Sequence, residues 1–305
     1  MPSFTDKVAK QLVRASGIKR RLAQTAETEN DPERLAKLVR KLRRFDRSQP
    51  PGRLRRRWNV ETIAVEGHAL HVVADRAGQS RRVILYLHGG GYIFGPFVTD
   101  WASCRRVASS TGCDFAVLDY PKVPEHEAPQ TIAVTMQAYA VLEGRYGATS
   151  IILVGTSAGG GLALALMAQL RDEGRELPAM AILISPGVDV TLAEPIGDLE
   201  QHDVLLSVAH VRSAGRLYAG DLGAHHPSVS PLFGNLGGLP PLWVFAATSE
   251  ILYPSLRTFV QTAQEAGTAA TLVVGEGQQH TWPLAPTPDG RKALREIAEI
   301  IGNGG

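Results

Sequence analysis

Hydrophobic residues along this chain form two kinds of pattern. Uninterrupted apolar runs of about five residues are typical of strands that are buried on both faces of a parallel sheet. Longer stretches between these runs repeat apolar residues at helical spacing. The alternation of the two patterns predicts an α/β fold built on a mostly parallel sheet. The expected strands span 82–87, 114–118, 151–154, 180–184, 242–247 and 270–274, and the expected helices span 101–110, 130–143, 158–171, 255–266 and 289–301.

Two further strands and one insertion complete this pattern. Residues 60–65 and 70–73 predict strands that meet at Glu66-Gly67, a dipeptide that suits a tight hairpin turn. Residues 193–236 show no clear strand and contain one expected helix, at 210–217. We therefore expect 193–236 to be an excursion from the sheet.

The N-terminal segment carries helical patterns only. Apolar residues recur at roughly helical spacing between 8 and 18, and Asp31-Pro32 suits the N-cap and first turn of a second helix. A cluster of Arg and Lys follows, over 34–57, which suits a membrane-surface or nucleic-acid patch, or a solvated helix face. The short apolar stripe favours the solvated face. We expect 1–58 to be a helical cap segment and 59–305 the main domain.

The amino-acid composition is typical of a globular protein and does not indicate a particular function. The 305 residues are 44% hydrophobic and 20% charged, with a net charge of +2, which is ordinary for a globular domain and favours no nucleic-acid partner. Cys104 and Cys113 are too few for a disulfide framework, so we expect them to be reduced and the protein to be cytoplasmic. No apolar run of 18 residues and no secretory signal pattern is found, so we expect no stable membrane insertion.

The most informative stretch is 151–164, where an aliphatic run meets Gly155-Thr156-Ser157-Ala158-Gly159 and then an Ala/Leu-rich helix. A strand that turns sharply into a helix with G-x-S-x-G at the corner is a nucleophile elbow. The turn demands small residues around the serine and raises its hydroxyl above the sheet, at the positive end of a helix dipole. Ser157 is therefore the candidate nucleophile.

A second glycine-rich loop follows the strand at 82–87. His88-Gly89-Gly90-Gly91 would leave backbone N–H groups free to bind negative charge that develops on a carbonyl oxygen. We expect Gly89, Gly90 and Ala158, the residue after the candidate nucleophile, to form an oxyanion hole. His88 precedes Ser157 and is expected to be structural.

The two motifs together resemble the hormone-sensitive-lipase-like bacterial esterases of the α/β-hydrolase superfamily. The resemblance covers roughly 60–300 and includes 120–126, which is similar to the family's Y-R-L-A-P-E-H stretch but departs from it at Pro121 and Val123. Thr156 also departs, because the family usually has an acid there. The resemblance implies an α/β-hydrolase fold with an eight-stranded, mostly parallel sheet and a helical cap, to which 193–236 contributes a second portion.

Chain order in this fold places the acid and the histidine after the serine. Glu250 directly follows the strand at 242–247, where the family has an aspartate, and is the expected triad acid. Asp189, one strand earlier, is the rival. His280 is the only histidine beyond Glu250 and follows the last strand, so we expect it to be the base.

The resemblance implies hydrolysis of esters with short to medium acyl chains, with a small-molecule ester as the partner and no cofactor or metal. A lactone or an arylamide is the closest alternative substrate. Two other functions are alternatives: a ligand receptor of the same fold that has lost catalysis, and a lipase attached to membranes by the Arg-rich N-terminal segment. The sequence also leaves a homodimer open. The expected pocket residues are Tyr92, Phe94 and Trp282.

Overall fold

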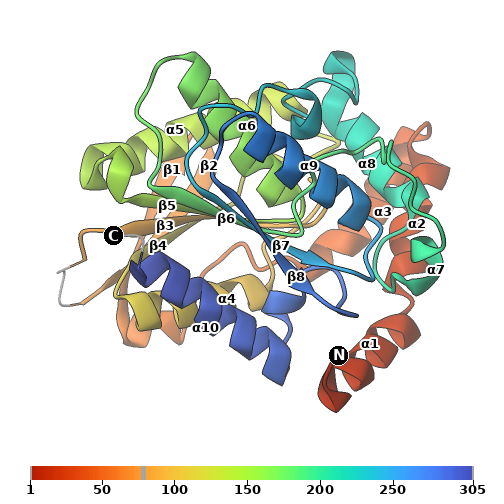
Figure 1. Ribbon diagram of the computed structural model, residues 1–305, viewed down its shortest axis with the longest axis horizontal. Helices are drawn as coiled ribbons and strands as arrows, with labels where there is room; N and C mark the ends of the chain where they lie inside the picture. The colour runs from red at the N-terminus through yellow and green to blue at the C-terminus, as the bar shows by residue number, and fades with distance from the viewer. Residues whose placement is uncertain (1, 77–79, 304–305) are drawn as a thin grey trace.

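One eight-stranded sheet forms the centre of the molecule (Figure 1). The structure is a computed structural model that describes residues 2–76 and 80–303. The strands lie in the order β1-β2-β4-β3-β5-β6-β7-β8, and all neighbours from β4 to β8 run parallel, whereas β2 is antiparallel to both β1 and β4. Their bounds are β1 Trp58–Val65, β2 His68–Asp75, β3 Val83–Leu87, β4 Asp114–Leu118, β5 Ile151–Thr156, β6 Met180–Ile184, β7 Leu242–Ala247 and β8 Ala270–Gly275.

Alternation of side chains along the central strands explains why their sequences are apolar throughout. In β3, Val83, Leu85 and Leu87 join the hydrophobic cluster on one face of the sheet, whereas Ile84 and Tyr86 join the cluster on the other. Both faces of a parallel sheet are covered by helices, so neither set of positions can be polar. The fold predicted from the sequence is thereby confirmed.

Helices cover both faces of the sheet (Figure 1). Two of them, α4 and α10, pack on one face, and α5, α6 and α9 cover the other. The helices lie within a few residues of the ranges expected from the sequence. Their bounds are α4 Val98–Thr111, α5 Ala128–Tyr146, α6 Ala158–Asp172, α9 Tyr253–Glu265 and α10 Pro288–Asn303.

The predicted hairpin joins β1 and β2 with Val65 opposite His68. Glu66 and Gly67 both have positive φ, at 48° and 82°. Two successive residues with positive φ match the twist of an antiparallel pair, which is why a dipeptide ending in glycine occupies this turn.

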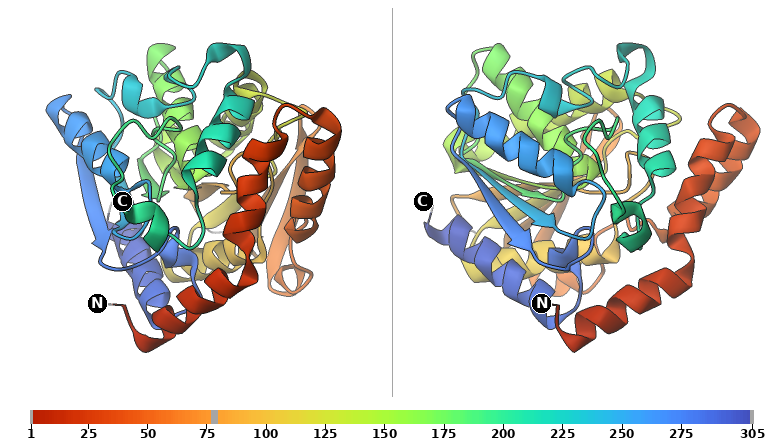
Figure 2. Two further views of the ribbon diagram at one scale, coloured as in Figure 1. Left: turned by 90° about the vertical axis from the view of Figure 1, so that its right-hand side faces the viewer. Right: turned by 45° about the vertical axis from the view of Figure 1, so that its right-hand side comes forward.

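The N-terminal segment lies along one flank of the sheet, beyond its carboxyl end (Figure 2). It forms three helices, α1 Phe4–Ser16, α2 Ile18–Thr28 and α3 Pro32–Leu42. The expected single helix over 8–18 is interrupted at Gly17, whose left-handed φ of 67° ends α1 and starts α2. The second expected helix begins as predicted, with Asp31 accepting a hydrogen bond from the Arg34 amide and Pro32 in the first turn.

The insertion at 193–236 lies beside these helices. It contains the short α7 Leu199–His202 and α8 Val208–Ala219, and α8 packs against α2 (Figure 2). No helix among the described residues is long and apolar enough to cross a membrane.

Candidate active site

Ser157 sits at the corner where β5 ends and α6 begins. Its backbone has φ 52° and ψ −119°, a strained conformation for a residue with a side chain. The corner is so tight that a Cβ at Gly159 would lie 2.1 Å from the Leu87 carbonyl oxygen, so only glycine fits there. The strained turn holds the Ser157 side chain at the carboxyl end of the sheet, next to the first N–H groups of α6.

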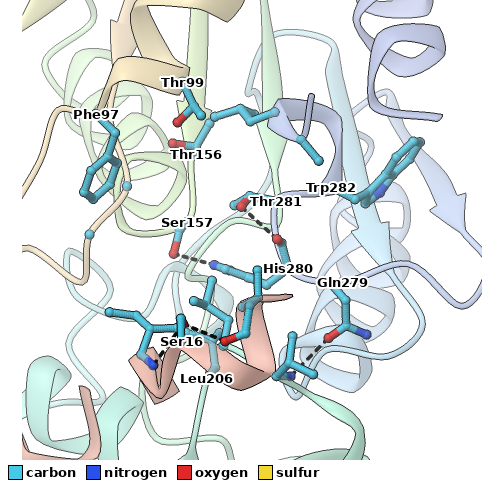
Figure 3. Close-up of a pocket in the computed structure, with 18 of the residues that line it drawn as sticks. Ser16, Phe97, Thr99, Thr156, Ser157, Leu206, Gln279, His280, Thr281 and Trp282 are labelled. Atoms are coloured by element: carbon cyan, nitrogen blue, oxygen red, sulfur yellow. Dashed lines mark hydrogen bonds between the residues drawn. The ribbon is translucent and has the colours of Figure 1, made fainter. Parts of the chain in front are cut away.

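The hydroxyl of Ser157 faces His280 (Figure 3). Ser157 Oγ lies 2.9 Å from Nε2 of His280, and Nδ1 of the same ring lies 2.6 Å from Glu250 Oε2. A carboxylate only accepts hydrogen bonds, so Nδ1 carries the proton and Nε2 presents its lone pair to the serine hydroxyl. The ring is thus in the tautomer that accepts a proton from Ser157.

The Glu250 side chain is fully buried and fixed at both oxygens. Oε2 accepts from His280, and Oε1 accepts from the Ala247 amide at 2.9 Å. The rival acid, Asp189, is buried too, but its oxygens accept from the Thr191 amide and hydroxyl and from the Ala193 amide. Asp189 therefore stabilises a turn, and of the two candidates the structure brings Glu250 to the histidine.

The glycine loop after β3 lies directly above Ser157. A Cβ at Gly89 would be 3.2 Å from the Ser157 Cβ, and one at Gly90, where φ is 113°, would be 1.9 Å from the Phe94 carbonyl oxygen. Within residues 2–76 and 80–303, no hydrogen bond is found for the amides of Gly89, Gly90 or Ala158. Gly89 and Gly90 border the same space as Ser157, and Ala158 follows the serine in the chain, so amides without a partner at these positions suit the binding of an oxyanion.

Residues 84–284 match the model of a family described as having the alpha/beta hydrolase fold. The chain belongs to this family. It is 32% identical over 288 residues to an acetyl-hydrolase of Streptomyces hygroscopicus, with 90% of each chain covered, and 31% identical to an esterase of Acinetobacter venetianus, covering 79% of this chain and 80% of the relative.

Solved structures agree with these relatives. An esterase of the bacterial hormone-sensitive lipase family superposes with a TM-score of 0.78 at 28% identity, covering 100% of this chain and 99% of the other. A hormone-sensitive lipase from a metagenome library gives a TM-score of 0.80 at 26% identity, with 98% of each chain covered. The resemblance seen in the sequence is confirmed, as is the enzyme class: a serine hydrolase of carboxylesterase type.

Several contacts hold the glycine loop of this hydrolase in place. Nδ1 of His88 lies 2.7 Å from the Gly89 carbonyl oxygen, its ring stacks on Tyr120 at 4.0 Å, and the Tyr120 hydroxyl donates to the His88 carbonyl. Burial lowers the pKa of His88 to about 3, so the ring is neutral at ordinary pH. Arg43 donates from Nε to the Ile93 carbonyl and pairs through two nitrogens with Glu125.

Behind the serine, the hydrolase has an acid that the sequence analysis missed. Asp100, at the start of α4, accepts from the Tyr86 hydroxyl at 2.7 Å, and that hydroxyl lies 3.3 Å from Thr156 Oγ1. Burial raises the pKa of Asp100 to about 6. A carboxyl group thus lies close to the elbow although position 156 itself is a threonine.

A cavity of about 710 Å³ opens in front of Ser157 and His280. Phe94 and Trp282 border it, and α1 forms one wall. Tyr92 instead borders a smaller space that also adjoins Ser157, and its ring stacks on Tyr218 at 3.6 Å. Further residues around the cavity include Ala9, Lys10, Val13, Leu22, Phe97, Leu205, Leu206 and His210.

The insertion is bonded to both loops that carry the histidine and its acid. Asp203 Oδ2 accepts from the amide of Ile251, next to Glu250, at 3.0 Å, while Oδ1 accepts from the amides of Leu205 and Leu206. Gln279, next to His280, accepts from the Val204 amide at 3.1 Å (Figure 3). No local pattern in the sequence marks Asp203 or Gln279, because their partners lie far along the chain.

Proposed function

We propose that this hydrolase cleaves carboxylic esters with short to medium acyl chains through a covalent acyl-enzyme on Ser157. One observation supports this most strongly: a hydrogen-bonded series runs from Ser157 through His280 to Glu250, at 2.9 and 2.6 Å. Among the described residues, the amides of Gly89, Gly90 and Ala158 have no hydrogen-bond partner. The relatives named acetyl-hydrolase and esterase support the same substrate class.

The reaction follows from the positions of the protons. His280 Nε2 accepts the Ser157 proton as Oγ attacks the ester carbonyl, and the new oxyanion is bound by the amides of Gly89, Gly90 and Ala158. Each such donor contributes about 3 to 4 kcal/mol to transition-state stabilisation. The protonated ring then gives its proton to the departing alcohol oxygen, and Glu250 stabilises its charged form.

Deacylation repeats these steps with water. His280 removes a proton from a water molecule that attacks the acyl carbonyl, and returns it to Ser157 Oγ as the acid product leaves. The two steps together consume one ester and one water and yield one acid and one alcohol. No residue outside the same six positions, Ser157, His280, Glu250, Gly89, Gly90 and Ala158, is needed for this chemistry.

In this proposal, 1–58 and 193–236 form a cap over the catalytic domain at 59–305. Both segments border the cavity, mostly with apolar side chains. An apolar wall that excludes water strengthens the electrostatic interactions at the reacting carbonyl. The cap would also set the shape of the substrate that reaches Ser157.

The test is hydrolysis of 4-nitrophenyl acetate, butyrate and octanoate, together with inactivation by an aryl phosphonate. We expect turnover of the shorter esters and one phosphonyl group per chain, attached to Ser157 in a peptide-mass map. A γ-butyrolactone and an acetanilide in the same panel test the alternative substrates. Absence of turnover on all esters, or modification at another residue, would refute the proposed function.

A second expectation concerns Asp203. The variant Asp203→Asn replaces one carboxylate oxygen by an NH₂ group, which is not an acceptor. The remaining oxygen can accept from the Ile251 amide or from the Leu205 and Leu206 amides, but not from both sides. We expect kcat to fall about tenfold, since a lost hydrogen bond to a charged group is worth roughly 1.5 to 3 kcal/mol, part of which positions Glu250. Steady-state kinetics on 4-nitrophenyl acetate measure it, with KM changing little.

Glu194 supplies the control for this variant, because it lies in the same insertion but accepts from Thr258, away from both loops. Glu194→Gln should keep kcat within about twofold, in line with a surface change. Equal losses in the two variants would mean that Asp203 acts through the general stability of the insertion rather than through the Glu250 loop.

A further inference from the structure

A second, smaller space also borders Ser157. It has a volume of about 50 Å³. Ser157 borders both spaces, whereas His280 borders only the larger one. The smaller space, called the recess below, is lined by residues that include Gly91, Tyr92, Asp189, Leu206 and His210.

Proton transfer decides which part of an ester enters each space. The departing alcohol oxygen must lie at Nε2 of His280 to receive its proton, so the alcohol group extends into the larger cavity. The acyl group, bonded to Ser157 Oγ, then points to the side that His280 does not border, which is the recess. At about 10 to 15 Å³ per water-sized group, the recess has room for roughly three to five such groups, so it suits a short acyl chain.

One polar side chain in the recess has an unused hydrogen-bonding atom. His210, on α8, is 3% exposed, and its Nδ1 lies 3.0 Å from Thr25 Oγ1 on α2. The Thr25 hydroxyl proton is already donated to the Leu22 carbonyl oxygen, at 2.7 Å. With that proton on the Leu22 side, Nδ1 donates to Thr25, and Nε2 is the unprotonated acceptor.

The His210 ring stays neutral at ordinary pH. Burial lowers its pKa to about 4, the Leu22 carbonyl opposes that shift, and the positive charge that His280 can carry adds to it. A Cβ built on Gly91 would lie 3.3 Å from His210 Nε2, so this nitrogen faces the oxyanion loop. Among the residues that the structure describes, no donor is bonded to Nε2. The lone pair is therefore available to a group in the recess.

We propose that His210 Nε2 accepts a hydrogen bond from a hydroxyl group on the acyl chain, and that the preferred substrates are esters of short hydroxy acids. This inference rests on the proposed esterase activity, because it places the acyl group by the position of His280. A methyl group in the same place would leave Nε2 without a donor. A buried hydrogen-bonding atom left unpaired is a common basis of discrimination between isosteric substrates.

The test compares phenyl glycolate with phenyl propionate, which differ only by hydroxyl in place of methyl. The measured quantity is the ratio of their kcat/KM values in each variant, divided by the ratio in wild type, so the intrinsic reactivity of the two esters cancels. Phenol release reports both reactions.

Two variants separate substrate binding from support of the cap. In His210→Asn, the amide nitrogen takes the place of Nδ1 and retains a donor to Thr25, but nothing replaces Nε2. In His210→Gln, the amide group reaches the place of Nε2 and can accept, but the bond to Thr25 is lost. We expect the Asn variant to lose about tenfold of the preference for glycolate, and the Gln variant to keep most of it. His202→Gln, on exposed α7, is the control and should match wild type.

Each outcome bears on one proposal. If both esters are hydrolysed and the Asn variant keeps the wild-type ratio, the role of His210 is refuted while the esterase activity stands. Loss of preference in Gln but not in Asn would assign His210 to the Thr25 contact alone, and would also overturn the inference. If wild type hydrolyses neither ester nor any 4-nitrophenyl ester, the proposed function itself fails.

Discussion

Alanine at position 157 is expected to lower kcat for 4-nitrophenyl acetate by about 10⁶-fold, the scale seen when a serine hydrolase loses its nucleophile. The structure explains why no neighbour would substitute for it. Among the residues that the structure describes, only Ser157 has a hydroxyl bonded to His280 Nε2, at 2.9 Å. The unpaired amides of the glycine loop remain in the variant, so a residual rate above that of water is expected from oxyanion binding.

The control for this variant is Ser110→Ala, on the exposed part of α4, where the hydroxyl only donates to the Arg106 carbonyl. It should retain the wild-type rate. Thermal unfolding of the Ser157→Ala protein should occur at or above the wild-type temperature, because the strained corner keeps its glycines and loses no core contact. Comparable ester turnover by wild type and Ser157→Ala would show that the acyl-enzyme proposal is wrong.

The candidate catalytic residues could be predicted from the sequence because each follows a local pattern. An apolar run such as 151–154 identifies a buried strand, and the chemistry in a doubly wound sheet lies just beyond the carboxyl ends of its strands. Ser157, Glu250 and His280 each come within six residues after such a run, and Gly89 and Gly90 do as well. A strand prediction therefore predicts the site too.

The cap residues could not be found in this way. His210 is hydrogen-bonded to Thr25, which is 185 positions away in the chain. Asp203 is bonded to the Ile251 amide, which is 48 positions away. Neither lies in a motif, and histidine is intermediate in burial, so the residue type alone does not mark a buried position. Tyr92 shows the opposite difficulty, since it adjoins the oxyanion motif yet its ring packs on Tyr218 beside the recess rather than in the main cavity.

Side chains outside the elbow motif at 155–159, those of Tyr86 and Asp100, also lie close to it. Position 156 has a threonine where the family usually has an acid. In the folded protein, however, the Asp100 carboxyl group is linked to Thr156 through the Tyr86 hydroxyl. The three side chains come from α4, β3 and β5, which only the folded sheet brings together. Substitutions at one of these positions are therefore expected to depend on the residues present at the other two.

Removal of the Glu250 carboxylate is expected to have the second largest effect, a fall in kcat of about 10⁴-fold in Glu250→Ala. Without an acceptor at 2.6 Å, His280 Nδ1 loses the bond that fixes its tautomer, and Nε2 no longer reliably presents a lone pair to Ser157. Glu250→Asp, which keeps the charge on a shorter side chain, should recover part of the rate. Single-turnover acylation by 4-nitrophenyl acetate measures the effect directly.

Asp189→Ala is the matched comparison, because Asp189 is equally buried and also follows a strand of the sheet, yet it accepts only from Thr191 and Ala193. We expect this variant to unfold more readily, by about 1 to 3 kcal/mol for the amides left unpaired, and to keep kcat within about tenfold. The two variants thus separate a carboxylate that acts on the base from one that stabilises a turn. A large loss of kcat in Asp189→Ala with little loss in Glu250→Ala would show that Asp189, not Glu250, is the triad acid. It would also mean that the 2.6 Å contact between Glu250 and His280 does not control the base.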